Sequence, residues 1–586
     1  MNERLLSTLD WVMIGSFLLL SLIIGLVYSK RAGKSTEEYF LSGRKLPWWI
    51  AGTAMVATTF AADTPLAVTE LVARDGISGN WLWWSMAIGG MMTVFFFAPL
   101  WRRAGVLTDL EFTELRYDGP AAAFLRGFRA VYLGLFMNAV IIGWVNLAMV
   151  KIVTVVLPGL SPEGFILGAM VFVAIYSSLS GQWGVAVTDT FQFVLAMTGC
   201  VVLAWFALDH PSIGGIEGLQ SNLLSSTFEM VPRITDTSVS GVLSLSLAAF
   251  FTYIGVIWWS SWYPGNEPGG GGYIAQRMMS AKNETHALVS TLWFNIAHYC
   301  LRPWPWILVA LVSLVMFPGL PESDQGKGFV MVMKEVLPSG WYGFLLAAFL
   351  AAYMSTISTH LNWGASYVVN DMLKRFVVPN KSDRRLVWYS RLVTVVIMLI
   401  SFWMTFNVMS TIAGAWQFII DCGAGMGLVL ILRWYWWRIN AWSELAAMLT
   451  PLVVYPILTL GFQLEFPYTT LVTTAVTTLS WILVTLISPP VNHQHLTAFY
   501  RKTRPLGPGW TRFRNELNLE GVGIPLSRLF KLWILGITVI YGTLFAIACF
   551  IFNRYDLAIA FTGLVGVAAG LLKMDYDSHG WSFWDQ

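Results

Sequence analysis

The segment "MVATTFAADTPLAVTE", residues 55–70, interrupts an apolar run with a carboxylate, Asp63, and a proline, Pro65. Proline has no backbone N–H and disfavours helix at the residue before it, so the sequence predicts a helix that breaks near Ala61 to Pro65. At membrane depth, unwound backbone is tolerated only where it lines a cavity or is buried in protein. The segment therefore predicts an interrupted membrane helix beside a functional cavity.

The composition of the chain supports a membrane setting. Its 586 residues are 56% hydrophobic and only 12% charged, against about 25% charged residues in an average globular domain. Apolar segments long enough to cross ~30 Å of hydrocarbon recur from end to end, which leaves no room for a soluble domain. The N-terminus, "MNERLLSTLDWVM", lacks the features of a cleaved signal peptide, so we expect the first span to remain. These features predict an all-α polytopic membrane protein.

The distribution of positive charge predicts the orientation of the chain. Most of the 36 Lys and Arg residues fall in loops on one side if the N-terminus is placed outside. Because such loops face the cytoplasm, we expect a multi-pass protein of the plasma (inner) membrane with an external N-terminus and a cytoplasmic C-terminus.

Two later segments also depart from plain helix. "SSWYPGNEPGGGGYIAQR", residues 260–277, begins in a span and continues into prolines and glycines, and "QFIIDCGAGMGLVL", residues 417–430, places Asp421 before three alternate glycines. Interrupted helices five spans apart indicate a transporter built from two inverted five-helix repeats. The alternative for Gly269 to Gly272 is an ordinary inner loop.

The predicted organisation has six parts. They are a first span and basic inner loop (1–46), the first five-helix repeat (47–208), the second repeat (241–440), two extra spans (441–488), a basic cytoplasmic loop (489–527), and one or two C-terminal spans with a tail (528–586).

"AAYMSTISTHLN", residues 351–362, places four hydroxyls inside a long apolar stretch. Helical spacing brings Ser355, Ser358 and Thr359 to one side, with Thr356 beside them. Na⁺ is a hard cation that prefers oxygen ligands, and a broken helix frees backbone carbonyls. The hydroxyls therefore predict a cation site against the break. The alternatives are hydroxyls bonded to carbonyls of their own helix, or small residues that let helices pack closely.

Four segments in order resemble the sodium/solute symporter family, which includes sodium–glucose and sodium–proline transporters. They are "STEEYFLSGRKLPWWIAGTAMVATTFAADTPLAVTELVARDG" (35–76), "SSLSGQWGVAVTDTFQF" (177–193), "YIAQRMMSAKNETHA" (273–287) and "WWRINAWSE" (436–444). The resemblance covers roughly residues 35–445. The Pro/Gly insertion at 264–272 and the spans after residue 527 depart from the family pattern.

The resemblance implies a LeuT-like fold, with one extra N-terminal and three or four extra C-terminal spans, and a sodium site. Matched residue by residue, that site consists of Ala61, Thr64, Ala352, Ser355 and Thr356. Some relatives have a second sodium site, which here implies Asp189, Ser358 and Thr359. We therefore expect one or two coupling Na⁺ ions and no organic cofactor.

The solute site is expected at mid-membrane between the broken helices. The candidate contacts are Asp63, Glu70, Trp262, Tyr263, His298 and Asp421. Two carboxylates facing the cavity, Asp63 and Asp421, would repel an anion, so a sugar or polyol is favoured, with an amino acid such as proline as the alternative. His298 has a second interpretation as a core histidine.

Together these features predict a Na⁺-coupled symporter that imports a small polar organic solute by alternating access. Its expected partners are the solute, Na⁺ and the lipid bilayer, with no nucleic acid; the sequence does not indicate an oligomeric state. Enzyme motifs such as H-E-x-x-H or a Walker A loop are absent from the sequence, so we expect no enzyme. A channel would need a charge-lined pore, which the sequence does not show. A transporter-like nutrient sensor is a further alternative, although such a protein would usually carry a soluble signalling module.

Overall fold

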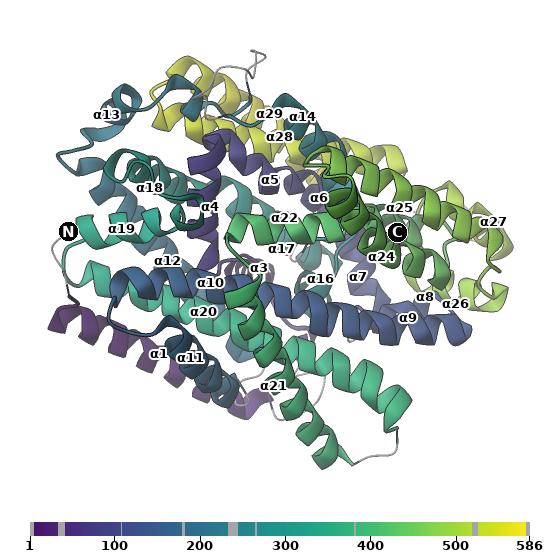
Figure 1. Cartoon of the computed structure of the whole chain (residues 1–586). Coiled ribbons are helices and arrows are strands. Elements are labelled where there is room, and N and C mark those ends of the chain that lie inside the picture. Colours follow the sequence, from purple (N-terminus) through teal and green to yellow (C-terminus); the bar gives the residue numbers. More distant parts are fainter. Residues whose placement is uncertain are drawn as a thin grey trace.

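A computed structural model describes residues 5–32, 41–106, 108–177, 182–232, 244–263, 267–379, 382–518 and 525–581. Within these ranges the chain is helical, apart from one β-bridge between Leu46 and Ala281. Among the described residues, ten helices are long and apolar enough to cross a membrane alone, and one bent pair makes an eleventh span. The other spans named below are built from shorter apolar helices or from the broken helix over residues 48–75. Figure 1 shows how these helices are arranged along the chain.

One helix precedes two groups of five spans. It is α1 (Thr8–Ala32), followed by the short η1 (Ser42–Arg44). The first group contains α3 (Trp48–Thr58), α4 (Asp63–Asp75), η2 (Ile77–Asn80), α5 (Trp81–Trp84), α6 (Met86–Met92), η3 (Thr93–Phe97), α7 (Ala98–Ala104), α8 (Glu111–Arg116), α9 (Gly119–Val131), η4 (Tyr132–Met137), α10 (Asn138–Val156), α11 (Pro162–Ser177) and α12 (Gln182–Asp209).

A linker leads to the second group. The linker holds α13 (Gly215–Asn222) and η5 (Ser225–Phe228). The second group contains α14 (Leu247–Thr252), η6 (Tyr253–Ile257), α15 (Trp258–Ser260), α16 (Gly272–Ser280), α17 (Glu284–Ile296), η7 (Ala297–Leu301), α18 (Pro303–Met316), η8 (Glu322–Asp324), α19 (Lys327–Val336), α20 (Trp341–Ser366), η9 (Tyr367–Val377), α21 (Asp383–Asn407), α22 (Ile412–Cys422) and α23 (Met426–Tyr435). Because each group has an odd number of spans, the two enter the membrane from opposite sides.

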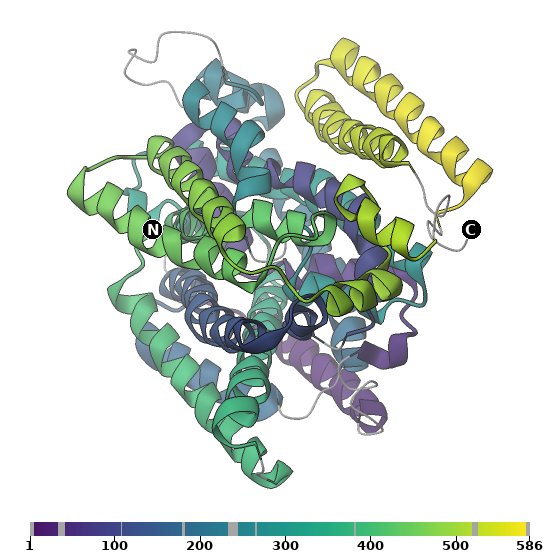
Figure 2. The ribbon, with the colours of Figure 1, turned by 90° about the vertical axis from the view of Figure 1, so that its right-hand side faces the viewer.

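Four further spans follow the two groups. The remaining elements are α24 (Ala441–Pro456), η10 (Ile457–Gly461), α25 (Tyr468–Ile487), α26 (His493–Thr503), η11 (Pro508–Trp510), α27 (Thr511–Glu516), α28 (Leu526–Ile551) and α29 (Tyr555–His579). The last helix has 25 residues and is long enough to cross. Figure 2 shows α28 and α29 as a hairpin at the edge of the bundle.

The first helix break lies slightly earlier than the sequence suggested. Helix α3 ends at Thr58 and α4 begins at Asp63, so the unwound residues are 59–62. Pro65 stands in the first turn of α4, where the missing N–H would have no intrahelical partner in any case. The proline therefore starts the second half-helix instead of lying within the break.

The second break is buried within the protein. Helix α15 ends at Ser260 and α16 begins at Gly272; residues 264–266 lie outside the described ranges. The glycine run from Gly269 is enclosed by the bundle, and the Trp101 indole N–H donates to the Gly269 carbonyl at 2.7 Å. These glycines are therefore buried against the helices, and the segment between α15 and α16 is not helical where it is described.

The three alternate glycines bring the second and third breaks together. Helices α22 and α23 bend by 52° at Gly423 to Gly425. The Trp262 N–H donates to the Gly423 carbonyl at 3.3 Å, and the Gly425 N–H donates to the Ser260 carbonyl at 2.9 Å. Gly425 has a φ of +88°, which favours glycine. A Cβ on Gly427 would lie 2.3 Å from the Trp259 carbonyl oxygen.

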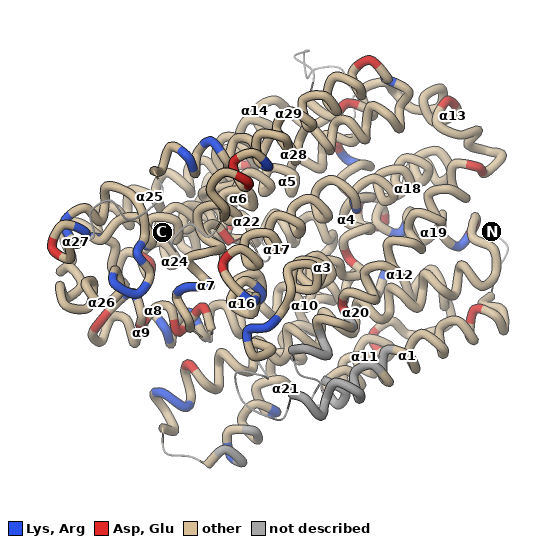
Figure 3. The backbone as a smooth tube through the Cα atoms, turned by 180° about the vertical axis from the view of Figure 1, so that it is seen from behind, with Lys and Arg blue, Asp and Glu red and all other residues tan. Residues whose placement is uncertain are grey.

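The basic segment after α25 packs onto one end of the bundle. Trp510 is fully buried and its indole N–H donates to the Trp434 carbonyl at 2.8 Å. Phe499 and Phe513 are buried beside it. The aromatic side chains of this segment therefore help to hold it against the bundle. Figure 3 shows Lys and Arg gathered at this end, around α8, α9, α16, α26 and α27.

Several charges inside the spans are paired. Lys151 on α10 contacts Glu70 on α4, with Nζ to Oε1 at 2.5 Å, and both side chains are buried. The second Glu70 oxygen accepts the backbone N–H of Ala413 at 2.8 Å. Because an unpaired charge inside a membrane protein is costly, this pair lets α4, α10 and α22 pack against one another.

We predict that Lys151→Met lowers the free energy of unfolding by about 3–5 kcal/mol, because it leaves the Glu70 carboxylate buried without its cation. The matched control is Lys327→Met, which removes a partly exposed pair with Asp324 at 2.9 Å and should cost less than about 1 kcal/mol. Thermal unfolding in detergent measures both variants. Equal losses would contradict a structural role for the buried pair.

Candidate functional site

One cavity of about 60 Å³ lies where both broken helices meet the hydroxyl-bearing helix α20. It is lined from the first break and its two half-helices, from the residues beside the second break, and from α5, α6, α10, η7, α20 and α22. The lining residues are Thr58, Thr59, Ala61, Asp63, Thr64, Trp83, Met86, Ile141, Trp144, Val145, Tyr263, Tyr273, His298, Tyr299, Arg302, Thr356, His360 and Trp416.

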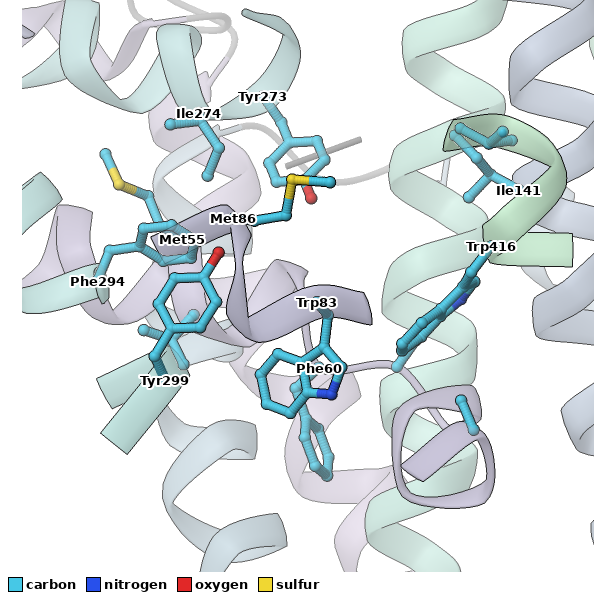
Figure 4. Packing of buried hydrophobic residues seen from close by; sticks show 14 of the residues in the cluster. Met55, Phe60, Trp83, Met86, Ile141, Tyr273, Ile274, Phe294, Tyr299 and Trp416 are labelled. Atoms are coloured by element: carbon cyan, nitrogen blue, oxygen red, sulfur yellow. The ribbon is translucent and has the colours of Figure 1, made fainter. Parts of the chain in front are cut away.

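Six of the eighteen lining residues are Trp or Tyr. Figure 4 shows Trp83, Tyr273, Tyr299 and Trp416 arranged around the central space, each from a different element. The rings of Trp83 and Tyr299 stack with centroids 5.9 Å apart, and Tyr263 meets Trp416 edge to face at 6.2 Å. Such walls present flat apolar faces together with indole N–H and phenol O–H groups.

Two opposite charges line the cavity. Asp63 is the first residue of α4, and a helix N-terminus stabilises a carboxylate. Arg302 follows the π-helical turn η7, just before Pro303 and Pro305, which remove the next regular backbone donors. Both side chains are buried. The cavity therefore holds one negative and one positive group with little net charge.

A hydrogen-bond chain fixes the state of His298. Arg302 Nη2 lies 3.2 Å from His298 Nε2, and His298 Nδ1 lies 3.1 Å from Thr59 Oγ1. A guanidinium only donates, so Nε2 must accept and Nδ1 must carry the proton. The Thr59 hydroxyl then donates to the Val56 carbonyl at 2.7 Å. In this arrangement the ring is neutral and is tied to the unwound segment.

The residues predicted for the first sodium site fall in two places. Ala61, Thr64 and Thr356 all line the cavity. Ala352 is buried one turn before Thr356 on α20. Ser355 is half-buried, and its hydroxyl donates to Asp189 Oδ1 at 2.8 Å.

The residues predicted for the second sodium site are connected to the first through that bond. Asp189 on α12 is buried, and its Oδ2 lies 3.6 Å from Arg277 Nη2. This oxygen accepts no hydrogen bond from the described residues. Ser358 is buried and Thr359 is half-buried one turn further along α20. The structure thus joins Asp189 directly to Ser355, which the sequence had assigned to the other site.

The four hydroxyls on α20 are not used to satisfy their own helix. Thr58, Thr69 and Thr291 each donate to the carbonyl four residues before them. For Ser355, Thr356, Ser358 and Thr359, no such bond occurs within the described ranges. Their oxygens therefore remain available to another ligand.

Three of the candidate solute contacts lie outside the cavity lining. Glu70 is held by Lys151 and the N-terminus of α22. The Trp262 indole donates to Glu267 Oε2 at 2.9 Å. Asp421 is buried against α25, where it accepts from Thr470 and from Gln417 Nε2 at 3.1 Å. Asp63, Tyr263 and His298 do line the cavity.

The sequence did not identify several lining residues. Arg302 was visible only as a cation within a span, and nothing local showed that it would face the cavity. His360 follows the hydroxyl run directly, and its Nδ1 lies 2.6 Å from Asn138 Oδ1. The signal for both was the same: an ionisable side chain inside an apolar span is a functional candidate by default.

Comparisons with known proteins agree with this architecture. The chain is 25% identical over 425 residues to a sodium/glucose cotransporter of Vibrio parahaemolyticus, covering 68% of this chain and 75% of that protein. It is 24% identical over 452 residues to an osmoregulated proline transporter of Bacillus subtilis, covering 75% and 86%. Its fold matches that of a Na⁺-coupled sialic acid symporter, with a TM-score of 0.64 at 17% identity, over 83% of this chain and 99% of that one.

The predicted LeuT-like, all-helical fold is thus confirmed. A family model, described as the sodium:solute symporter family, matches residues 39–450, which is well over half of the chain. The protein therefore belongs to the sodium:solute symporter family.

Proposed function

We propose that this protein imports a small polar organic solute, with a sugar or polyol favoured, by Na⁺-coupled alternating access. One observation carries the proposal: the unwound segment with Ala61, the hydroxyl of Thr356 and the polar groups Asp63 and His298 share a single cavity. A cation held between the unwound segment and the Thr356 hydroxyl would fix the position of this segment, and with it the positions of Asp63 and His298 in the cavity. In the proposed orientation, the N-terminus is outside and the C-terminus is cytoplasmic.

We propose two sodium ions per cycle. The first would take oxygens from Ala61, Thr64, Ala352, Ser355 and Thr356, and the second from Asp189, Ser358 and Thr359. The Ser355–Asp189 hydrogen bond supports communication between the two. Each entering Na⁺ gains ~2.3 kcal/mol per 100 mV, and a tenfold gradient adds ~1.4 kcal/mol. A second ion would therefore square the accumulation that one ion allows.

The cavity supports an uncharged solute rich in hydroxyl groups. The guanidinium of Arg302 is already engaged by Thr59 at 3.0 Å and by His298 at 3.2 Å, so it mainly compensates the charge of Asp63. Asp63 can accept hydroxyl donors, and the indole rings of Trp144 and Trp416 line the same cavity. Stacking on the aromatic walls suits a sugar ring.

An amino acid is the second candidate, because a carboxylate and a guanidinium share the cavity. The amine would bind Asp63 and the carboxylate would approach Arg302. This solute would have to displace part of the Arg302–His298–Thr59 network. The sequence suggested that Asp63 and Asp421 would repel an anionic solute. This repulsion is weaker than expected, since only Asp63 lines the cavity.

Uptake into proteoliposomes tests the proposed function. Labelled glucose, galactose, myo-inositol and proline are offered with an inward gradient of Na⁺ or of K⁺. We expect a sugar or polyol to accumulate with Na⁺ alone. Uptake that is indifferent to Na⁺ would overturn the coupling. Saturable binding without any flux would favour a nutrient sensor.

The sodium site predicts the behaviour of a double variant, Ser355→Ala with Thr356→Ala. Na⁺ alone should raise the melting temperature of the unmodified protein, because it binds only the folded state, and should not raise that of the variant. The control is Thr291→Ala, which removes a buried hydroxyl bonded to its own helix at 2.8 Å. A Na⁺ shift that survives in the double variant would exclude this site.

If a second Na⁺ binds at Asp189, replacing this residue should change the ratio of Na⁺ to solute transported. The ratio of Na⁺ flux to solute flux should be two in the unmodified protein and one in Asp189→Asn, because the neutral amide binds a cation far more weakly than a carboxylate does. Parallel measurement of both fluxes in the same vesicles gives the ratio. A ratio of one in the unmodified protein would exclude the second coupling ion and would remain compatible with the first.

The solute site predicts different outcomes for two buried aspartates. Asp63→Asn should raise the KM for the solute about tenfold or more, since it replaces a charged acceptor in the cavity. Asp421→Asn changes an equally buried carboxylate outside the lining and should leave the KM nearly unchanged. Uptake kinetics at saturating Na⁺ separate the two. If Asp421→Asn raised the KM and Asp63→Asn did not, the solute would bind near α25 and not in this cavity.

A further inference from the structure

A second, larger cavity lies at the edge of the bundle and takes no part in the transport site. Its volume is about 600 Å³, within the range of ligand pockets. It opens between α17, the start of α3 and the C-terminal hairpin α28–α29. Its lining residues are Trp48, Thr285, His286, Val289, Leu292, Ile296, Val539, Ala569, Leu572, Lys573, Tyr576 and Trp581.

The cavity is polar at one end and apolar along the rest of its length. Thr285 and His286 stand in the first turn of α17, and Lys573 stands near the end of α29. Going inward, only apolar side chains follow, down to Ile296. The helix rise from Thr285 to Ile296 is about 16 Å, close to the ~15 Å hydrocarbon depth of one leaflet.

The polar end is suited to an anion. His286 Nδ1 accepts the backbone N–H of Trp48 at 3.1 Å, so the neutral ring carries its proton on Nε2 and can donate it. Lys573 forms no ion pair with any described carboxylate. The lining itself contains no acidic residue. Nearby Glu284 is held by Arg103 at 3.0 Å.

Trp581 forms part of the wall of this cavity. Trp581 is 8% exposed, lines the cavity, and its indole N–H has no hydrogen-bond partner among the described residues. Its ring is fixed edge to face by Tyr576 at 5.0 Å and by Phe95 at 6.1 Å. Trp581 therefore forms a fixed aromatic wall of the cavity.

We propose that this cavity binds one anionic phospholipid. The phosphate would accept hydrogen bonds from Lys573 and His286, and an acyl chain would lie along α17 between Val289 and Ile296. Basic pockets between membrane helices are known to hold anionic headgroups, and Trp and Tyr are enriched at that depth. The lipid would fill the space between the helical core and a hairpin that lies beyond the family-matched residues.

The lipid would matter most for α29. Helix α28 is anchored to the core by Trp533 and Tyr541, whose N–H and O–H groups donate to carbonyls of Ile88 and Trp84, each at 2.9 Å. Helix α29 is the outermost helix of the hairpin in Figure 2. A bound lipid would connect it to α3 and α17 by contacts that protein side chains do not make.

Native mass spectrometry of the full-length protein tests the proposal, with phosphatidylglycerol and phosphatidylcholine of matched acyl chains as probes. The protein should retain one phosphatidylglycerol in preference to phosphatidylcholine. Lys573→Gln should reduce that preference about fivefold, as expected for one Lys beside an anionic headgroup. The matched control is Lys531→Gln on the same hairpin, at a similar depth because Arg528 pairs with Asp575 at 2.5 Å. It should have no effect.

A second variant tests the apolar part of the same cavity. Ala569→Phe would fill the acyl-chain path and should lower retention of both lipids, with the polar end intact. Equal binding of the two lipids by the unmodified protein would overturn the proposal, as would equal effects of the two lysine variants. Because binding is measured without solute or Na⁺, these outcomes are independent of the proposed transport function.

Discussion

The structure depends on one constraint: backbone N–H and C=O groups that are left unwound inside a membrane protein need polar partners. Residues 59–62 leave the helical ladder between α3 and α4. Their surroundings are a hydroxyl of α20, a neutral histidine and a buried arginine, all at one cavity. The second and third breaks satisfy the same constraint through one another, by the bonds between Ser260, Trp262 and the glycines of the α22–α23 bend.

Buried charged side chains inside the bundle are likewise placed close to groups of opposite charge. The pairs Lys151–Glu70 and Arg277–Asp189 compensate buried charges near the helix breaks. Towards one end of the bundle, Glu267 of the Pro/Gly insertion lies 3.6 Å from both Arg129 and Arg433. In the cavity, Asp63 and Arg302 carry opposite charges, although no ion pair within hydrogen-bond distance joins these two described residues. A cavity that is nearly neutral, polar and aromatic suits a small solute that sheds its water on entry.

The local features of the site were visible in the sequence. The break near Asp63 follows from a proline in an apolar run, and the hydroxyl cluster follows from helical spacing. Pairings over long sequence separations were not visible. Arg302 and Thr59 are 243 positions apart, and Ser355 and Asp189 are 166 apart. The hydrophobic pattern of a sequence does not show which faces of two distant helices pack against each other. The same limit explains Glu70, which looked like a solute contact until its partner on α10 was known.

The most direct test is a high-resolution map of the protein prepared in Na⁺ and again with choline in its place. The account predicts a density peak among the carbonyl oxygens of the unwound segment and the hydroxyls of Ser355 and Thr356. The peak should be present in Na⁺ and absent in choline. Two results would contradict the account: continuous helix through residues 59–62, or an unwound segment with the same empty space in both maps.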